Sequence, residues 1–157
     1  MKILRTTPQD AYAVSQLING VASYFTLDPQ GKGAEAFLQT ISPVAIQRNI
    51  EAPNFAYFKV IVGAQLAGVV AMRDNTHLYH LFVRPEFQGK GLSRKLWEYV
   101  RAVSMAAGNS GCYTVNSTPY AVPVYERFGF KPTGPKVETD GIAFVPMRLE
   151  PEGKNAG

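Results

Sequence analysis

One stretch of this sequence, residues 82–103, constrains the fold more than any other. It starts inside the aromatic and aliphatic run 77–83, which is typical of a β-strand. Pro85 ends that strand, because proline brings no N–H group to a hydrogen-bond ladder. A turn containing Gly89 and Gly91 follows. Apolar residues then recur with the period of one helix face, at Leu92, Leu96, Val100 and Val103. The stretch therefore predicts a strand, a glycine turn and a helix, in that order.

This order of elements suits a bound phosphate group. The first turn of a helix leaves main-chain N–H groups without partners, and the aligned peptide dipoles place about half a positive charge there. Glycines allow a ligand to approach the main chain closely, and Lys90, Arg94 and Lys95 add positive charge nearby. A Gly-x-Gly turn also occurs in ordinary strand-to-helix connections. The turn alone therefore leaves both interpretations open.

Two common phosphate-binding motifs are excluded by the residues themselves. A Walker loop requires Gly-x-x-x-x-Gly-Lys followed by Ser or Thr. Here Gly91 follows Lys90, and no glycine stands at the required upstream position. A dinucleotide fingerprint requires Gly-x-Gly-x-x-Gly, and Arg94 stands where its third glycine would be.

The turn resembles motif A of the GNAT acyltransferases, Gln/Arg-x-x-Gly-x-Gly/Ala. It matches at Gln88 and Gly91, while Ser93 replaces the final small residue. The resemblance implies that main-chain amides bind the pyrophosphate of acetyl-CoA, namely those of Gln88, Gly89, Lys90, Gly91, Leu92 and Ser93. It also implies that the main chain of Phe82 and Val83 pairs with the pantetheine arm like an added strand.

A second stretch, residues 116–130, resembles motif B of the same superfamily through its ending Tyr-Glu-Arg-Phe-Gly-Phe. Ser117 or Thr118 can cap a helix here, Pro119 suits its first position, and Gly129 suits a left-handed C-terminal cap. The two motifs occur in the expected order with a predicted strand between them. Together they are far more specific than either one alone.

The remaining pattern agrees with this resemblance. Strands are predicted at 2–5, 54–62, 66–72, 77–83, 112–115 and 141–149, the second to fourth of them as an antiparallel meander on short turns. Helices are predicted after Thr7, from 34 to 38, and from Ser42 to Ile50. We expect an α/β GNAT fold: a central, mostly antiparallel mixed sheet with a splayed parallel strand pair and helices on both faces. Residues 1–150 are expected to form one domain, followed by a polar tail at 151–157.

Composition narrows the function classes. Hydrophobic residues make up 46% of the 157 residues and charged residues 18%, which is typical of a globular protein. No apolar run is long enough for a membrane span, and no signal peptide is recognised, so a cytoplasmic location is expected. The net charge of +4 is spread along the chain. Its densest part coincides with the predicted phosphate site, so we do not expect nucleic-acid binding.

Catalytic roles follow from the resemblance. Tyr125 is implied as the acid that protonates the departing thiolate. His77 takes the position of a strand residue that serves as the base in relatives, although water could serve instead. Because side chains alternate along a strand, Tyr79 is expected to share the face of His77, with His80 on the opposite face. Asn116, at a strand end, is a candidate for binding the pantetheine amides.

The predicted function is acetyl-CoA-dependent N-acetylation of a primary amine by direct attack in a ternary complex. The lone cysteine, Cys112, stands outside both motifs, so no covalent acyl-enzyme is expected, and no metal is expected either. The alternative is a non-catalytic acyl-CoA-binding or regulatory domain. The expected acceptor is the amine of a small molecule or a peptide, and the resemblance is compatible with a homodimer, since dimers are common in the superfamily. Four residues of the early helical region could contact an acceptor but have more ordinary surface or core roles: Tyr24, Phe25, Glu35 and Glu51.

Overall fold

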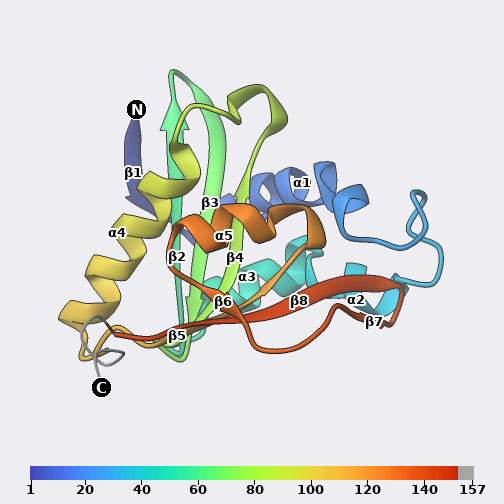
Figure 1. The fold of residues 1–157 in the computed structure, drawn as a ribbon. Coiled ribbons are helices and arrows are strands. Elements are labelled where there is room, and N and C mark those ends of the chain that lie inside the picture. The colour runs from blue at the N-terminus through green and yellow to red at the C-terminus, as the bar shows by residue number, and fades with distance from the viewer. Residues whose placement is uncertain (152–157) are drawn as a thin grey trace.

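The computed structural model describes residues 1–151, so the predicted polar tail lies, apart from Pro151, outside the described residues. One sheet runs through the molecule in the order β1-β2-β3-β4-β5-β8-β6, with β7 paired to β8 (Figure 1). Its strands are β1 (Lys2–Arg5), β2 (Phe55–Val62), β3 (Gln65–Arg73), β4 (His77–Val83), β5 (Tyr113–Ser117), β6 (Lys131–Pro132), β7 (Val137–Thr139) and β8 (Ile142–Leu149). The short strands β6 and β7 were not predicted from the sequence.

Five α-helices and four short 3₁₀ turns are formed within residues 1–151. The α-helices are α1 (Ala11–Gly20), α2 (Glu35–Thr40), α3 (Pro43–Glu51), α4 (Leu92–Ala106) and α5 (Val122–Arg127). The 3₁₀ turns are η1 (Pro8–Asp10), η2 (Ala22–Tyr24), η3 (Pro85–Phe87) and η4 (Pro119–Ala121). The predicted cap at Thr118 is confirmed, since its hydroxyl oxygen accepts from the Ala121 N–H at 3.1 Å. The cap begins η4, and α5 continues from it.

The predicted sheet pattern is confirmed. Strands β2, β3 and β4 pair antiparallel in sequence order, and β4 then pairs parallel with β5. Strand β8 returns antiparallel beside β5. The fold is therefore the expected α/β arrangement with a mostly antiparallel, mixed sheet.

A β-bulge in β4 corrects one prediction about side-chain direction. The register pairs Ala71 with His80 but Met72 with Leu78, so Tyr79 is an extra residue in β4. Tyr79 and His80 consequently project to the same face, where their rings lie 5.1 Å from Phe55 and 5.9 Å from Tyr57, respectively. Simple alternation had placed His80 opposite Tyr79. A bulge breaks that alternation because two residues oppose one on the neighbouring strand.

Helices cover both faces of the sheet, each over its own apolar cluster. Helices α4 and α5 lie on one side, with α1 and α3 on the other (Figure 1). The side of α4 and α5 is organised by Trp97, whose indole packs edge-to-face on Tyr113 at 5.2 Å and 5.3 Å from Phe130. Trp97 thus joins α4, β5 and the end of the α5 segment. This contact holds the start of α4 close to α5, where the site described below is formed.

His80 makes the stability of this fold pH-dependent. It is buried beside Tyr57, whose hydroxyl oxygen lies 3.3 Å from its Nδ1, and Asn49 contacts the same hydroxyl at 3.3 Å. Burial, and to a lesser degree the nearby His77, lowers the pKa of His80 to about 3. The unfolded value is about 6.5. A histidine whose pKa is lower in the folded state stabilises the fold fully above its unfolded pKa, and progressively less as the pH falls toward the folded value.

We therefore expect His80 to remove about 2 kcal/mol from the free energy of unfolding between about pH 7.5 and about pH 5. His80→Phe should lack this contribution, so its pH dependence over that interval should be shallower by the same amount. Urea denaturation of both proteins at the two pH values measures the difference. Equal pH dependence in the two proteins would contradict the assignment.

Among residues 1–151, no helix combines the length and the apolar character needed to cross a membrane.

Candidate active site

The site forms where the two parallel strands separate. Strands β4 and β5 pair only at their beginnings, His77 with Thr114 and Leu78 with Val115. Beyond these pairs β5 stays paired to β8 as far as Ser117, so β4 and β5 diverge (Figure 1). The main-chain edge of β4 after Tyr79 therefore has no strand beside it on that side.

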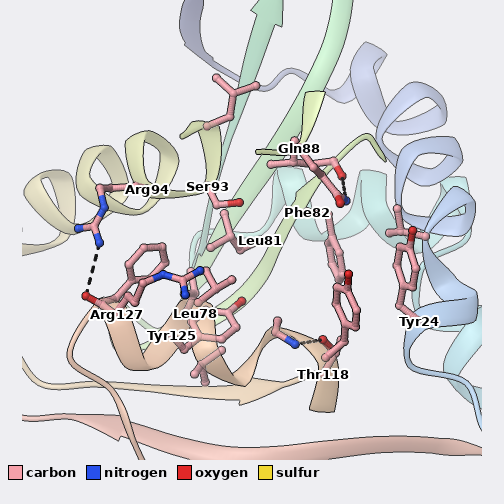
Figure 2. Close-up of a pocket in the computed structure, with 18 of the residues that line it drawn as sticks. Tyr24, Leu78, Leu81, Phe82, Gln88, Ser93, Arg94, Thr118, Tyr125 and Arg127 are labelled. Atoms are coloured by element: carbon pink, nitrogen blue, oxygen red, sulfur yellow. Dashed lines mark hydrogen bonds between the residues drawn. The ribbon is translucent and has the colours of Figure 1, made fainter. Parts of the chain in front are cut away.

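A cavity of about 400 Å³ occupies this separation. Its walls come from both faces of the sheet: Val21 and η2 on one, and the start of α4 and the second half of α5 on the other. Figure 2 shows Gln88 and Ser93 above Tyr125, with Arg94 and Arg127 at one end and Tyr24 at the other. The cavity thus passes through the gap between the strands and opens toward both layers of helices.

Unpartnered amides lie at one end of the cavity. None of the main-chain N–H groups from Gly89 to Arg94 donates to an acceptor within residues 1–151, and the first helical bond to close is from the Lys95 N–H to Gly91 O, at 3.1 Å. Gly91, the N-cap of α4, has a left-handed φ of +79°, and Gly89 has a φ of +78°. Glycine adopts this conformation without steric cost. The turn therefore presents a row of free donors at the positive end of the α4 dipole.

Gln88 does not belong to that row of donors. Its main-chain N–H donates to the Pro85 carbonyl at 3.2 Å, and its side-chain Nε2 donates to the Val83 carbonyl at 2.9 Å. Both bonds tie the turn to the end of β4. Gln88 thus shapes the turn. The sequence had suggested that the free amides begin at Gln88, but in the structure they begin at Gly89.

The hydrogen-bond ladder between β3 and β4 determines which main-chain groups of β4 face the cavity. The Arg84 N–H donates to Ala67 O at 2.8 Å, so this pair is hydrogen-bonded. Because bonded pairs alternate in an antiparallel ladder, Phe82 should bond to β3, while Leu81 and Val83 direct their main-chain groups to the opposite side. Of the two residues predicted to pair with pantetheine, Val83 therefore faces the gap with its main chain. Phe82 lines the cavity with its ring instead.

Two arginines give the amide end of the cavity its charge. Arg94 and Arg127 both line the cavity, and the Arg94 guanidinium contacts the Arg127 carbonyl at 3.4 Å. The same guanidinium lies 5.1 Å from the centroid of the Phe128 ring. Lys90 is exposed outside the lining, with its Nζ 5.7 Å from the Phe87 ring. These cations add to the α4 dipole and favour an anion at the turn.

Tyr125 lines the cavity from α5. Its side chain is only 6% exposed and is held edge-to-face by Phe128 at 6.0 Å and Phe130 at 5.7 Å. No side chain or carbonyl of residues 1–151 forms a hydrogen bond with its hydroxyl. Burial raises the pKa of Tyr125 well above its ordinary value. The phenol therefore keeps its proton at neutral pH and holds it next to the cavity.

His77 lies away from this arrangement. It is not part of the cavity lining, and its Nδ1 lies 2.8 Å from the Thr114 hydroxyl oxygen, at the end where β4 and β5 are still paired. Burial, and then the positive charge of Arg73, lowers the pKa of His77. The structure thus does not bring His77 and Tyr125 together on one surface. The role of His77 as base remains a prediction.

The other predicted residues fall on the cavity, apart from Lys90. Asn116 lines it from the end of β5, opposite Pro146 of β8. Leu92 and Ser93 line it from the first turn of α4. Of the early residues with a conceivable acceptor role, Tyr24 and Phe25 belong to the lining, whereas Glu35 and Glu51 do not.

Several lining residues were not assigned to the site from the sequence. They include Leu81, Thr118, Tyr120, Val124 and Arg127. Their common signal is a position within a few residues of one of the two motifs. That signal is too general to distinguish a cavity wall from ordinary packing.

Comparison with family models covers the segments that form this site. The model of an acetyltransferase (GNAT) domain matches residues 25–151. This interval includes β4, the glycine turn, α4, β5 and α5. No curated protein sequence matches the chain.

Solved structures with the same fold cover nearly the whole chain. A GCN5-related N-acetyltransferase from Rhodopseudomonas palustris aligns with a TM-score of 0.78 at 14% identity, covering 95% of this chain and 94% of that chain. PaiA N-acetyltransferase from Thermoplasma acidophilum, solved in complex with coenzyme A, aligns at 0.74 and 15% identity, with coverage of 95% and 98%. YncA from Salmonella typhimurium, solved with acetyl-CoA, aligns at 0.72 and 16% identity, with coverage of 100% and 97%.

Proposed function

Because this chain belongs to the GNAT acetyltransferase family, we propose that it transfers the acetyl group of acetyl-CoA to a primary amine in a ternary complex. The observation that carries the proposal is the joining of two features in one cavity. Free main-chain donors of the Gly89–Arg94 turn line the cavity from the start of α4, and the protonated, buried Tyr125 lines the same cavity from α5.

The residues present fit coenzyme A. The turn amides would hold the pyrophosphate, because they have no acceptor in the described protein and lie at the positive end of the α4 dipole. Arg94 and Arg127 would add charge to the same end. The main-chain edge of β4 at Leu81 and the Val83 N–H would pair with the amide groups of the pantetheine arm, with Asn116 lining the cavity from β5, whereas the Val83 carbonyl already accepts from Gln88 Nε2.

The chemical step requires one acid and a neutral nucleophile. The amine nitrogen attacks the thioester carbonyl carbon, so a C–N bond forms while the C–S bond breaks with its electron pair on sulfur. Tyr125 gives its hydroxyl proton to that sulfur, and the proton lost by the nitrogen returns through water to the tyrosinate oxygen. Burial raises the pKa of Tyr125, so its hydroxyl is protonated at neutral pH and has a proton to give as the thiolate departs.

Direct attack fits the placement of the other candidate groups. Cys112 lies outside the cavity lining and contacts the Arg148 guanidinium, so no thiol is positioned to form an acyl-enzyme there. The lining also carries no histidine or carboxylate within the described residues. We therefore propose that water, rather than His77, takes the proton that the amine loses.

The proposal is tested by calorimetric titration with acetyl-CoA, followed by measurement of CoA release with a panel of primary amines. We expect saturable binding and amine-dependent CoA release well above the rate of thioester hydrolysis. Binding without release for any amine would favour the alternative, a non-catalytic acyl-CoA-binding domain. Absence of binding would overturn both.

A further inference from the structure

The two ends of the cavity differ in their chemistry. One end presents the turn amides with Arg94 and Arg127. The other is walled by aromatic rings, those of Tyr24, Phe25, Tyr79, Phe82 and Tyr120. Figure 2 shows Tyr24 on the far side of the cavity from Arg94 and Arg127, with Phe82 between them. Since the amide end is taken by the pyrophosphate in the proposed function, the aromatic end is left for the acceptor.

Two tyrosines form the rim of this aromatic end. The rings of Tyr24, on η2, and Tyr120, on η4, are stacked with centroids 5.5 Å apart and planes 11° from parallel. They are 46% and 74% exposed, so the stack stands at the mouth rather than in the core. The early segment that contains η2 and the later segment that contains η4 therefore meet across the entrance.

Deeper in, the aromatic wall is fixed by tertiary contacts. Phe25 is buried, with its ring edge-to-face on Phe37 at 5.1 Å and tilted against Phe82 at 5.9 Å. Its carbonyl accepts from the Ala143 N–H of β8 at 2.9 Å. A second bond, from the Leu27 N–H to Gly141 O at 2.8 Å, holds the same loop to the β7–β8 hairpin. The wall is therefore preorganised.

Charge distinguishes between classes of acceptor. Arg94 and Arg127 are the charged residues of the lining, and within the described residues it contains no Asp, Glu or His. A polyamine or another polycation would bring several ammonium groups into a cavity that offers no carboxylate to pair with them. Desolvating an unpaired charge is strongly unfavourable.

We propose that the acceptor is a compact primary amine carried on an aromatic or similarly apolar group, and that Tyr24, Phe25, Phe82 and Tyr120 recognise that group. This inference rests on the proposed acetyl transfer and adds to it the class of acceptor. A ring placed beside these side chains gains both apolar burial and offset or edge-to-face aromatic contact. The volume of about 400 Å³, shared with the pantetheine arm, limits the acceptor to a small body.

The same wall assists the chemistry without a basic side chain. An apolar environment disfavours the ammonium form and lowers the pKa of a bound amine. The amine therefore reaches the thioester as the neutral nucleophile that the reaction requires. A lining without carboxylate or imidazole agrees with this mode of deprotonation.

The test compares three acceptors with acetyl-CoA at saturation: 2-phenylethylamine, hexylamine and spermidine. We expect kcat/KM to fall in that order, with 2-phenylethylamine at least about 30-fold above spermidine, because spermidine loses the aromatic contact and adds unpaired charge. Spermidine equal to or better than 2-phenylethylamine would overturn the proposal.

Substitutions of the two rim tyrosines test whether they recognise the acceptor. Tyr24→Ser and Tyr120→Ser should each lower kcat/KM for 2-phenylethylamine about 10-fold while leaving the Kd of acetyl-CoA unchanged. Tyr12→Ser is the matched control, because Tyr12 is 63% exposed on α1 and lies outside the lining. Tyr120→Glu should raise kcat/KM for spermidine, since it places a carboxylate at the mouth. No loss in either serine variant, or equal loss in Tyr12→Ser, would contradict the assigned subsite.

These outcomes separate the inference from the function on which it rests. If acetyl-CoA binds and spermidine is the best acceptor, the acetyltransferase proposal stands and the aromatic-acceptor proposal falls. If acetyl-CoA does not bind, the function itself is wrong.

Discussion

Tyr125→Phe is expected to lower kcat for amine acetylation about 100-fold, the lower end of what a positioned general acid contributes. The ring remains to fill its place between Phe128 and Phe130, so the cavity wall is kept. Only the hydroxyl, which has no hydrogen-bond partner in the described protein, is removed. The Kd of acetyl-CoA should therefore change by less than about threefold, and the loss should appear in kcat rather than in binding.

Tyr113→Phe provides the matched control for this experiment. Tyr113 is also fully buried, on the adjacent strand β5, and its hydroxyl likewise has no partner within residues 1–151. It lies outside the cavity lining. We expect Tyr113→Phe to keep the wild-type kcat. A wild-type kcat in Tyr125→Phe, or an equal loss in both variants, would show that the Tyr125 hydroxyl is not the acid.

The same assay decides between water and His77 as the base. His77 is separated from the lining and is engaged with Thr114, so His77→Gln, which retains a hydrogen-bonding side chain, should alter kcat by less than about threefold. A loss as large as that of Tyr125→Phe would establish His77 as the base and would contradict proton transfer to water alone.

Gly91→Val is expected to weaken acetyl-CoA binding about 100-fold. Gly91 has a φ of +79°, a conformation that a β-branched residue adopts only at a large steric cost. Relief of that strain would turn the neighbouring amides away from their common direction. Loss of two charge-assisted hydrogen bonds, at about 1.5 kcal/mol or more each, accounts for the expected change in Kd.

Gly63→Val separates this effect from a general loss of stability. Gly63 also has a positive φ, +63°, and open space around it, but it lies in the turn between β2 and β3 and outside the cavity lining. Both variants should lose similar thermal stability, whereas only Gly91→Val should lose affinity by isothermal titration. Wild-type affinity in Gly91→Val would exclude the turn as the pyrophosphate site.

Local features of the site were predictable because their causes are local. The strand, the turn and the first turn of α4 follow from Pro85, the two glycines and the apolar period that begins at Leu92. The cap at Thr118 needs only a hydroxyl three residues before an N–H group. Donors that remain free at a helix start are likewise a property of any helix, so the amides of this turn could be expected from the sequence.

Other features depended on contacts between distant segments. The bulge at Tyr79 results from the pairing of β4 with β3, and it turns His80 toward Tyr57. Gln88 closes onto Pro85 and Val83 and so leaves the row of free donors. No local sequence pattern predicts the bulge at Tyr79 or the hydrogen bonds of Gln88.

The amino-acid sequence alone determined the order of strands and helices, the glycine turn with its free amides and the family, because hydrogen bonding within a few residues and steric limits on φ act along the chain. Tertiary structure alone decided which side chains share the cavity: Tyr125 with Ser93, Tyr24 with Tyr120, and His77 outside it. The physical reason is that the cavity wall forms where β4 and β5 separate and helices from both faces of the sheet come together. Their relative positions depend on strand register and packing across the whole sheet, which no single segment determines.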